Sequence, residues 1–321
     1  MYDVTGLGEL LIDFTPAGSS SAGNVLFERN PGGAPPNVLA AIARLGGRGA
    51  FIGKVGDDQF GHFLKRVLEE NNIESGGLVF SPDENTTLAF VHLDGKGDRS
   101  FSFYRKPGAD TTLQPEELDL ELIRQSRIFH FGSLTLTAEP ARSATLRALE
   151  YAKQQGKIIS YDPNWRPPLW ESEAAAKAGM LLGLRFADIV KVSEEELGFL
   201  TGEKDLEKGS ALLFDSGIRL VVVTLGAKGC FYRCAEGTGH LPTYDIKVVD
   251  TTGAGDAFFG GLLYSISKLD KKLEEVSLDE MAEIVDFSNA VGALCTTKRG
   301  GIPAMPYPEE VEHCRKQVPK L

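Results

Sequence analysis

Two kinds of segment alternate along most of this chain. Apolar runs rich in β-branched residues have the composition of strands buried on both faces of a parallel sheet. These runs are TGLGELLID, GAFIGKV, RIFHFGSL, KIISYDP, DIVKVS and RLVVVTLG. Between them lie segments with helical apolar spacing, which end near Asn72, Gly156 or Gly202. The alternation predicts an α/β fold with a doubly wound, mostly parallel sheet and helices on both faces.

Two segments interrupt the alternation. Residues 14–31 are rich in glycine and serine and then become extended, and residues 86–105 form two alternating runs around LDGKGDR. A glycine-rich tip between alternating runs is a strong signal for a β-hairpin. We therefore expect one domain over residues 1–321, with a small β-sheet lid inserted in the α/β core and formed by about 14–31 and 86–108.

The charge balance restricts the partners of the chain. Its 34 basic and 45 acidic side chains give a formal net charge of −11. A field of this sign repels phosphodiester backbones, so we expect no nucleic-acid partner. A phosphorylated ligand would have to be held by local cations, backbone amides and Mg²⁺.

The sequence also restricts the location of the protein. No window contains the eighteen or so consecutive apolar residues of a membrane helix, so no membrane partner is expected. The N-terminal stretch MYDVTGLGELLIDF lacks a basic region, so we expect no secretion signal. The four cysteines have neither CxxC nor Cys/His metal spacing, which favours free thiols in a reducing, cytoplasmic compartment.

The stretch DTTGAGDAFFGG, residues 250–261, carries the strongest candidate for chemistry. A helical apolar pattern follows it, so its glycines lie where a loop enters a helix. Free amides and the positive end of the helix dipole form an anion site at such a position. Asp256 is either a residue of the first helical turn with only a capping role or a side chain aimed at a ligand of those amides.

A second candidate is PGGAPPNVLAAIARLGG, residues 31–47. Gly32 and Gly33 would let a polyhydroxy ligand approach the backbone, and Asn37 offers both a donor and an acceptor to hydroxyl groups. The alternative interpretation is a Gly/Pro turn before a helix that is buried through small residues.

Together these motifs are similar to the two signatures of the ribokinase-like (PfkB) carbohydrate kinases. The resemblance rests on GGAPPN, KVGDDQFG and DTTGAGDAFFGG and extends over essentially the whole chain. Within the family, DPNWRPPLW (residues 162–170) and IVKVSEEELGFLTG (residues 189–202) are most similar to fructokinases. The resemblance implies a ribokinase-like fold and ATP-dependent transfer of the γ-phosphoryl group to a sugar hydroxyl.

The resemblance assigns the catalytic group. It implies that Asp256 accepts the proton of the attacking hydroxyl and that the amides of Gly253, Ala254 and Gly255 form an anion hole. This agrees with the loose transition state of phosphoryl transfer, in which positioning and electrostatics dominate. A purely capping role for Asp256 becomes the minor interpretation.

The resemblance also implies a sugar site. Its residues are Asp13, Gly32, Gly33, Asn37, Phe103, Arg105 and Arg166. Asp13, taken as the end of the first strand, could accept from two adjacent hydroxyls, or form a turn before Thr15 and Pro16. Phe103 and Arg105 lie on the expected hairpin, where they either close over the sugar or belong to a surface strand.

For the nucleotide, the resemblance implies Lys191, Ser193, Thr224, Gly226, Lys228, Gly229 and Asn289. Many family members have asparagine at the position of Ser193, and Glu196 is implied to organise Mg²⁺ through water. Ser193 and Glu196 also have the spacing of a capping box. The alternative is a plain tight hairpin at residues 224–229 and a polar helix face at Asn289.

A monovalent cation, K⁺ in the first instance, is implied beside the anion hole. The matching residues are Asp250 and Thr252 with the backbone carbonyls of Cys295, Lys298, Gly300 and Ala304. Such a cation would neutralise Asp250 and hold the GAGD turn in shape.

The expected reaction is the phosphorylation of D-fructose to fructose 6-phosphate. The alternatives are 2-keto-3-deoxygluconate kinase, another PfkB sugar or nucleoside kinase, and a sugar-binding protein without turnover. A nicotinamide-dependent dehydrogenase is disfavoured because GLGELLID lacks the full GxGxxG motif. Exposed strand edges on the lid predict a homodimer formed through it.

Overall fold

The computed structural model describes residues 1–93 and 99–321. The tip of the predicted hairpin, residues 94–98, lies outside the described residues.

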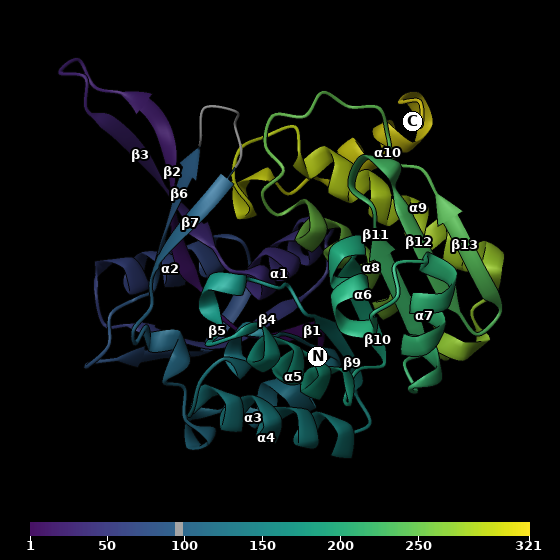
Figure 1. The fold of residues 1–321 in the computed structure, drawn as a ribbon, viewed down its shortest axis with the longest axis horizontal. Coiled ribbons are helices and arrows are strands. Elements are labelled where there is room, and N and C mark those ends of the chain that lie inside the picture. Colours follow the sequence, from purple (N-terminus) through teal and green to yellow (C-terminus); the bar gives the residue numbers. More distant parts are fainter. Residues whose placement is uncertain (94–98) are drawn as a thin grey trace.

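A nine-stranded sheet forms the centre of the molecule, with the strand order β13-β12-β11-β10-β9-β8-β1-β4-β5 (Figure 1). The seven strands from β5 to β11 in this order are parallel, and β12 and β13 are antiparallel to their neighbours. Their bounds are Tyr2–Leu7 (β1), Gly49–Gly56 (β4), Ile73–Ser81 (β5), Ser126–Gly132 (β8), Ile158–Asp162 (β9), Ile189–Ser193 (β10), Leu220–Thr224 (β11), Cys230–Cys234 (β12) and Gly237–Leu241 (β13). The predicted doubly wound, mostly parallel sheet is confirmed.

Helices cover both faces of this sheet, because successive strand residues point to opposite sides. In β11, Leu220 and Val222 pack in one hydrophobic core and Val221 and Val223 in the other. The first core contains α1 (Ala34–Arg44), α2 (Gln59–Glu70), α8 (Ala254–Ser267), α9 (Leu278–Cys295) and α10 (Pro308–Gln317). The second contains α3 (Leu120–Arg124), α4 (Ala141–Gln154), α5 (Glu173–Leu184), α6 (Glu194–Thr201) and α7 (Leu206–Asp215).

The predicted helix stop signals are confirmed by the backbone. Asn72 (φ 56°), Gly156 (φ 64°) and Gly202 (φ 75°) all lie in the left-handed region directly after a helix. Short 3-10 helices occupy Ala109–Thr111 (η1), Pro115–Glu117 (η2), Leu134–Leu136 (η3), Pro167–Leu169 (η4), Gly226–Lys228 (η5), Leu273–Glu275 (η6) and Ile302–Ala304 (η7).

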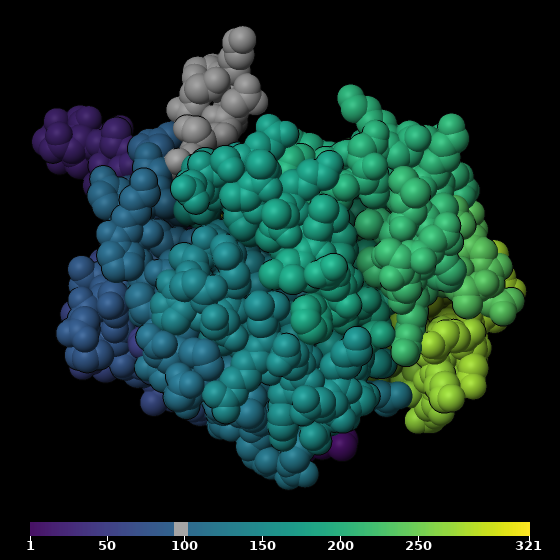
Figure 2. Space-filling model, turned by 60° about the horizontal axis from the view of Figure 1, so that its bottom comes forward, coloured from purple at the N-terminus to yellow at the C-terminus, as the bar shows by residue number. Residues whose placement is uncertain are grey.

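A separate four-stranded sheet projects from the body of the molecule, as Figures 1 and 2 show for the purple hairpin of β2 and β3. Its order is β3-β2-β6-β7, with bounds Val25–Gly32, Leu11–Ser19, Leu88–Leu93 and Arg99–Tyr104. This is the small sheet predicted from the two interrupting segments. Its role as a lid remains a prediction.

The first apolar run was interpreted wrongly as one strand. TGLGELLID divides between β1, which ends at Leu7, and β2, which begins at Leu11 in the small sheet. The chain turns at Gly8, where a Cβ atom would lie 2.4 Å from Pro35 Cγ, so only glycine fits. Asp13 therefore lies inside β2 and not at the end of the first strand.

Two further findings concern the predicted location. Across residues 1–93 and 99–321, none of the helices has the length and apolar character needed to cross a membrane. Cys230, Cys234, Cys295 and Cys314 are buried free thiols, as expected.

Candidate active site

Two cavities meet at the GAGD turn. Cavity A, of about 220 Å³, includes Gly253 and Asp256 in its lining. Cavity B, of about 330 Å³, includes Ala254 and Gly255, and Thr251 lines both cavities. Successive residues of one turn thus face two different ligand-sized spaces. The backbone of one turn therefore contributes to the walls of both cavities.

The turn owes its shape to glycine. Gly253 precedes α8 with φ 75°, and a Cβ atom on it would lie 3.0 Å from Gly301 Cα. A side chain would therefore be strained by both its backbone angle and its contact. The first amides of α8 remain directed at the junction of the cavities, where the helix dipole favours an anion.

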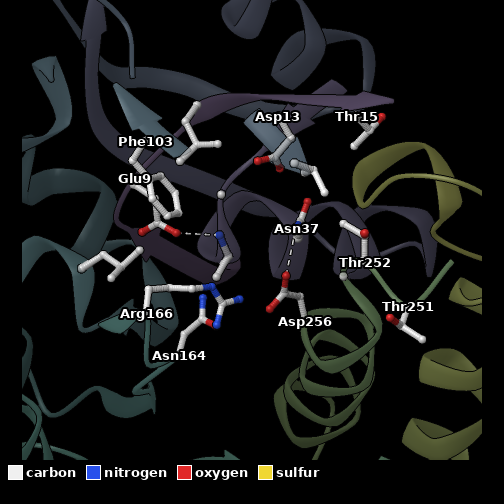
Figure 3. Close-up of a pocket in the computed structure, with 16 residues that line it drawn as sticks. Glu9, Asp13, Thr15, Asn37, Phe103, Asn164, Arg166, Thr251, Thr252 and Asp256 are labelled. Atoms are coloured by element: carbon white, nitrogen blue, oxygen red, sulfur yellow. Dashed lines mark hydrogen bonds between the residues drawn. The ribbon is translucent and has the colours of Figure 1, made fainter. Parts of the chain in front are cut away.

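Asp256 lies on the first turn of α8 and points into cavity A (Figure 3). Its Oδ2 accepts a hydrogen bond of 2.8 Å from Asn37 Nδ2 on α1. Burial raises the pKa of Asp256 to about 6, with a further increase from Asp162, while Lys191 and Asn37 act in the opposite direction. A carboxylate with this pKa is a better proton acceptor at neutral pH than an ordinary aspartate and is still largely ionised.

Asp13 lines cavity A from β2. Gly32 lies diagonally across from it on the neighbouring strand β3, where it pairs with Leu11, and a Cβ atom at position 32 would lie 2.1 Å from Asp13 Oδ2. The predicted role of Gly32 was close approach of a ligand to the backbone, but the structure shows that its missing side chain makes room for the Asp13 carboxylate. Burial raises the pKa of Asp13 to about 7, although the positive charge of Arg166 acts to lower it.

Arg166 is placed in cavity A by the loop after β9, together with Asn164. The backbone N–H of Trp165 donates to Glu196 Oε1 (2.6 Å), and Arg166 Nη1 donates to the Trp165 carbonyl (3.0 Å). Glu196, at the start of α6, therefore fixes the loop that presents Arg166.

Glu9 is a residue of cavity A that the sequence reasoning missed. Its Oε1 accepts a 2.8 Å hydrogen bond from the Ala34 amide at the start of α1, shown dashed in Figure 3. Burial raises the pKa of Glu9 to about 7. The signal available in the sequence was a carboxylate within the otherwise apolar run TGLGELLID, and the structure places it two residues beyond the end of β1, at the edge where ligands bind in such sheets.

Phe103 and Arg105 have different environments. Phe103 lines cavity A, as Gly33 and Asn37 also do. The prediction that Arg105 faces the sugar is not matched, because Arg105 forms a buried ion pair of 2.7 Å with Asp110. Its guanidinium also donates to the Leu134 carbonyl, so it ties β7 to the body of the molecule.

Cavity B is lined by some of the residues predicted to bind the nucleotide. Thr224, Gly226, Gly229 and Asn289 line it. Gly229 has φ 88° and leaves no room for a side chain, since a Cβ atom would lie 2.0 Å from the Leu241 carbonyl oxygen. In the part of the chain that the structure describes, the predicted residues Lys191, Ser193 and Lys228 are not part of this lining.

Ser193 and Glu196 form the capping box that was the alternative interpretation. Ser193 Oγ accepts from the Glu196 amide (3.1 Å), and Glu196 Oε2 accepts from the Ser193 amide (2.8 Å). Glu196 is buried, and its two oxygens hold both this cap and the Trp165 loop. Such an acceptor group, with further lone pairs, fits a water-mediated contact to Mg²⁺.

Asp250 joins the segments predicted to hold a monovalent cation. Its Oδ1 accepts from the amide (2.9 Å) and hydroxyl (2.7 Å) of Thr252, and its Oδ2 accepts from the Gly300 amide (3.1 Å). The carboxylate thus connects the GAGD turn to the 295–304 loop. The other predicted residues lie on that loop: Cys295 ends α9, Lys298 pairs with Glu310 at 2.9 Å, and Ala304 is buried in η7.

The fold and these two cavities on one glycine turn define a small-molecule kinase of ribokinase-like architecture. A sequence model of the pfkB family carbohydrate kinases matches residues 1–308. The chain belongs to this family.

The most similar relatives carry more specific names. Fructokinase-2 of Zea mays is 49% identical over 306 residues, covering 94% of this chain and 91% of the relative. The crystal structure of fructokinase with bound ATP from Xylella fastidiosa has a TM-score of 0.91 at 34% identity and covers 99% of both chains. A fructokinase double mutant from Vibrio cholerae, in a form with fructose, ADP and potassium ion bound, has a TM-score of 0.87 at 37% identity and covers 97% of both chains.

Proposed function

We propose that this protein is a fructokinase, which transfers the γ-phosphoryl group of ATP to D-fructose and forms fructose 6-phosphate. The observation that carries the proposal is the meeting of two cavities at the GAGD turn, with Asp256 on the side of cavity A. The named relatives and the fructokinase structures with ATP, or with fructose and ADP, support the same reaction.

The proposed reaction assigns a role to each part of this geometry. Asp256 takes the proton of the attacking sugar hydroxyl, whose oxygen forms a bond to the γ-phosphorus while the bond from that phosphorus to the bridging oxygen of ADP breaks. The amides of Gly253, Ala254 and Gly255 stabilise the charge on the transferred group. General-base assistance of this kind contributes about 10²–10⁴-fold to the rate.

The charges in cavity A favour a neutral sugar. Among the residues that the structure describes, Glu9, Asp13 and Asp256 line it together with one cation, Arg166. Carboxyl groups in either protonation state supply no positive charge, and Arg105 is paired with Asp110. A substrate with its own carboxylate would meet three acidic groups, so fructose is favoured over the alternative, 2-keto-3-deoxygluconate.

A coupled ADP-release assay tests the substrate. Fructose, 2-keto-3-deoxygluconate, ribose and adenosine are compared as acceptors at equal concentration. We expect the highest kcat/KM with fructose, and a higher value with any of the others would overturn the proposal. A sugar-binding protein without turnover would release no ADP with any acceptor, and a dehydrogenase would change nicotinamide absorbance instead.

We further propose which residues contact ATP, Mg²⁺ and K⁺. Thr224, Gly226, Gly229 and Asn289 would hold ATP from the lining of cavity B. Lys191, Ser193 and Lys228, which the resemblance assigns to the nucleotide, would add contacts from outside this lining. Glu196 would hold Mg²⁺ through water, and the metal would supply charge neutralisation on the phosphates. Asp250 and Thr252, with carbonyls of the 295–304 loop, would hold K⁺ and so stabilise the GAGD turn.

We further propose a homodimer in which the small sheet acts as a lid over cavity A. Val25, Leu26 and Phe27 of β3 are 62%, 46% and 38% exposed, and this apolar edge projects from the body (Figure 1). A second copy would cover these side chains and the strand edge. Light scattering at micromolar concentration would give twice the mass of the chain, and a monomeric mass would refute the dimer. The buried free cysteines favour a cytoplasmic location.

A further inference from the structure

The residues that follow α10 form part of the wall of cavity B. α10 ends at Gln317, and the tail, defined as residues 318–321, places Leu321 in the lining of this cavity. The match to the family model ends at residue 308, so it assigns no role to the tail. The contact between this segment and cavity B has to be explained from the residues of this chain.

The tail is held by its backbone against the loop that follows β13. The N–H of Leu321, at the end marked C in Figure 1, donates to the carbonyl of Thr243 (2.9 Å). One residue earlier, Lys320 forms an antiparallel bridge with Tyr244. Thr243 and Tyr244 also line cavity B. The tail and this loop therefore form one wall of the cavity, paired like two short strands.

A largely buried carboxylate on α9 anchors this wall. Asp286 accepts a hydrogen bond from the Tyr244 hydroxyl (2.9 Å) and pairs with Lys320 Nζ at 2.6 Å. It also pairs with Arg315 Nε of α10 at 2.9 Å. Burial acts to raise the pKa of Asp286, but the hydrogen bonds from Lys320, Arg315 and Tyr244 hold it below its ordinary value, so the carboxylate is ionised at neutral pH. Asp286 thus joins the loop, the tail and α10.

The wall presents apolar side chains to cavity B. Ile246, Val248 and Leu321 line the cavity, and the last two are 58% and 60% exposed. Apolar side chains that are exposed at the edge of a cavity gain free energy when a ligand covers them. The part of a nucleotide that offers an apolar face is the flat base, because the ribose and the phosphates are polar.

The wall lies beside a part of cavity B other than the anion-binding turn. The proposed phosphate contacts are the amides at the start of α8, such as that of Ala254. The wall instead adjoins Asn289 of α9, whose Nδ2 donates to the carbonyl of Pro242 (3.2 Å), next to Thr243. A nucleotide with its phosphates at α8 would therefore extend its base toward the wall.

We propose that the tail covers the base of the bound nucleotide, with Leu321 as the contact and Asp286 as the positioning residue that holds the tail through Lys320. The proposal rests on the kinase function given above and deepens it, since it names the part of the nucleotide that the tail recognises. The base is remote from the reacting phosphoryl group, so this contact is equally strong before and during transfer. It lowers the KM for ATP and leaves kcat unchanged.

Steady-state kinetics of Leu321→Asn and Lys320→Met test the proposal. Leu321→Asn should raise the KM for ATP about 10-fold, because a partly exposed leucine loses its apolar contact with the base. Lys320→Met should raise it about 5-fold, because the ion pair that anchors the tail is lost. Both variants should keep kcat and the KM for the sugar within twofold. The conservative variants Leu321→Met and Lys320→Arg should restore the KM for ATP.

Affinity for ADP supplies a second measurement, independent of turnover. Calorimetric titration should show ADP binding to Leu321→Asn about 10-fold more weakly than to the unmodified protein. An unmodified protein that binds ADP and does not phosphorylate fructose would remove the proposed substrate, and the two ADP affinities would still decide the role of the tail. An unmodified protein that binds neither ATP nor ADP would overturn both proposals.

Lys271→Met is the matched control. Lys271 pairs with Glu280 of α9, the helix that also carries Asp286, at 2.6 Å, and its side chain is 37% exposed against 42% for Lys320. In the part of the chain that the structure describes, this pair does not line cavity B. Lys271→Met should therefore keep the affinity for ADP. Equal ADP affinities of Lys320→Met and Lys271→Met, or of Leu321→Asn and the unmodified protein, would overturn the role of the tail.

Discussion

Asn37 Nδ2 donates a 2.8 Å hydrogen bond to Asp256 Oδ2, and the two residues are 219 positions apart in the chain. The bond joins the start of α1 to the start of α8 at the wall of cavity A. It leaves Asp256 Oδ1 to receive a proton and fixes the direction of the carboxylate. Asn37 therefore connects the first sequence motif to the second.

Replacement of Asn37 by alanine should lower kcat about 10- to 100-fold, because a catalytic group that is misplaced by about 1 Å loses up to about 10² in rate. The KM for ATP should remain close to that of the unmodified enzyme, since Asn37 lines cavity A and Asp256 still faces it. Steady-state kinetics with varied sugar and varied ATP would separate these effects. A kcat within twofold of the unmodified enzyme would contradict a role in alignment.

Asp256→Asn should abolish nearly all turnover while ATP affinity is largely kept. The amide cannot accept the hydroxyl proton, which removes about 10²–10⁴-fold of rate, and it retains the shape of the carboxylate. Calorimetric titration with a nonhydrolysable ATP analogue would report the affinity. Turnover within 10-fold of the unmodified enzyme would show that another group is the base.

The rate should fall at acidic pH with an apparent pKa near 6. The base must be ionised to accept a proton, and burial raises the pKa of Asp256 to about 6. The profile of kcat/KM for the sugar between pH 4.5 and 8 would show this limb. A limb at pH 4, the position of an ordinary aspartate, would contradict the buried environment described for Asp256.

Gly32→Ala should raise the KM for the sugar at least about 10-fold and leave the KM for ATP unchanged. Its Cβ atom would lie 2.1 Å from Asp13 Oδ2, so Asp13 would have to turn out of its position in cavity A. Gly76→Ala in β5 is the control, because its Cβ atom would meet only the flexible end of the Glu74 side chain. Equal sugar KM values for both variants would contradict this role of Gly32.

Asp13→Asn should stabilise the ligand-free protein strongly at pH 8 and by less than half as much at pH 5. The folded-state pKa of Asp13 is raised to about 7 from 3.8, so the folded state holds an extra proton between these values and the stability falls as pH rises through this window. The raised pKa corresponds to a loss of at most about 4 kcal/mol in the free energy of unfolding at pH 8. Thermal unfolding at both pH values measures it, and a stability difference independent of pH would contradict the buried carboxylate.

Local sequence patterns were sufficient for the architecture and for the two signature motifs. Apolar residues that recur with a period of 2 or 3.6 indicate which faces of strands and helices are buried. Glycine indicates positions where the backbone is left-handed or where another atom lies too close for a side chain. The alternation of strands and helices, the helix ends at Asn72, Gly156 and Gly202, and the turn before Asp256 were predicted on this basis.

Other features depended on residues far apart in the chain. The first apolar run divided between two sheets because the chain turns at Gly8, against Pro35. The Arg105 guanidinium pairs with Asp110, a buried partner that the sequence analysis did not consider. Glu9 lines the cavity, where its carboxylate accepts a hydrogen bond from the Ala34 amide, 25 positions away in the chain. None of these outcomes has a periodic signature in the sequence.

The sequence by itself determined the α/β layers and the glycine turn, and its resemblance to a family supplied a list of candidate site residues. Only the tertiary structure decided that Asn37 hydrogen-bonds Asp256, that Asp162 pairs with Lys191, and that the turn contributes to the lining of two cavities. The physical reason is that periodicity records the surroundings of each segment, whereas the distance between two side chains depends on how the whole chain packs.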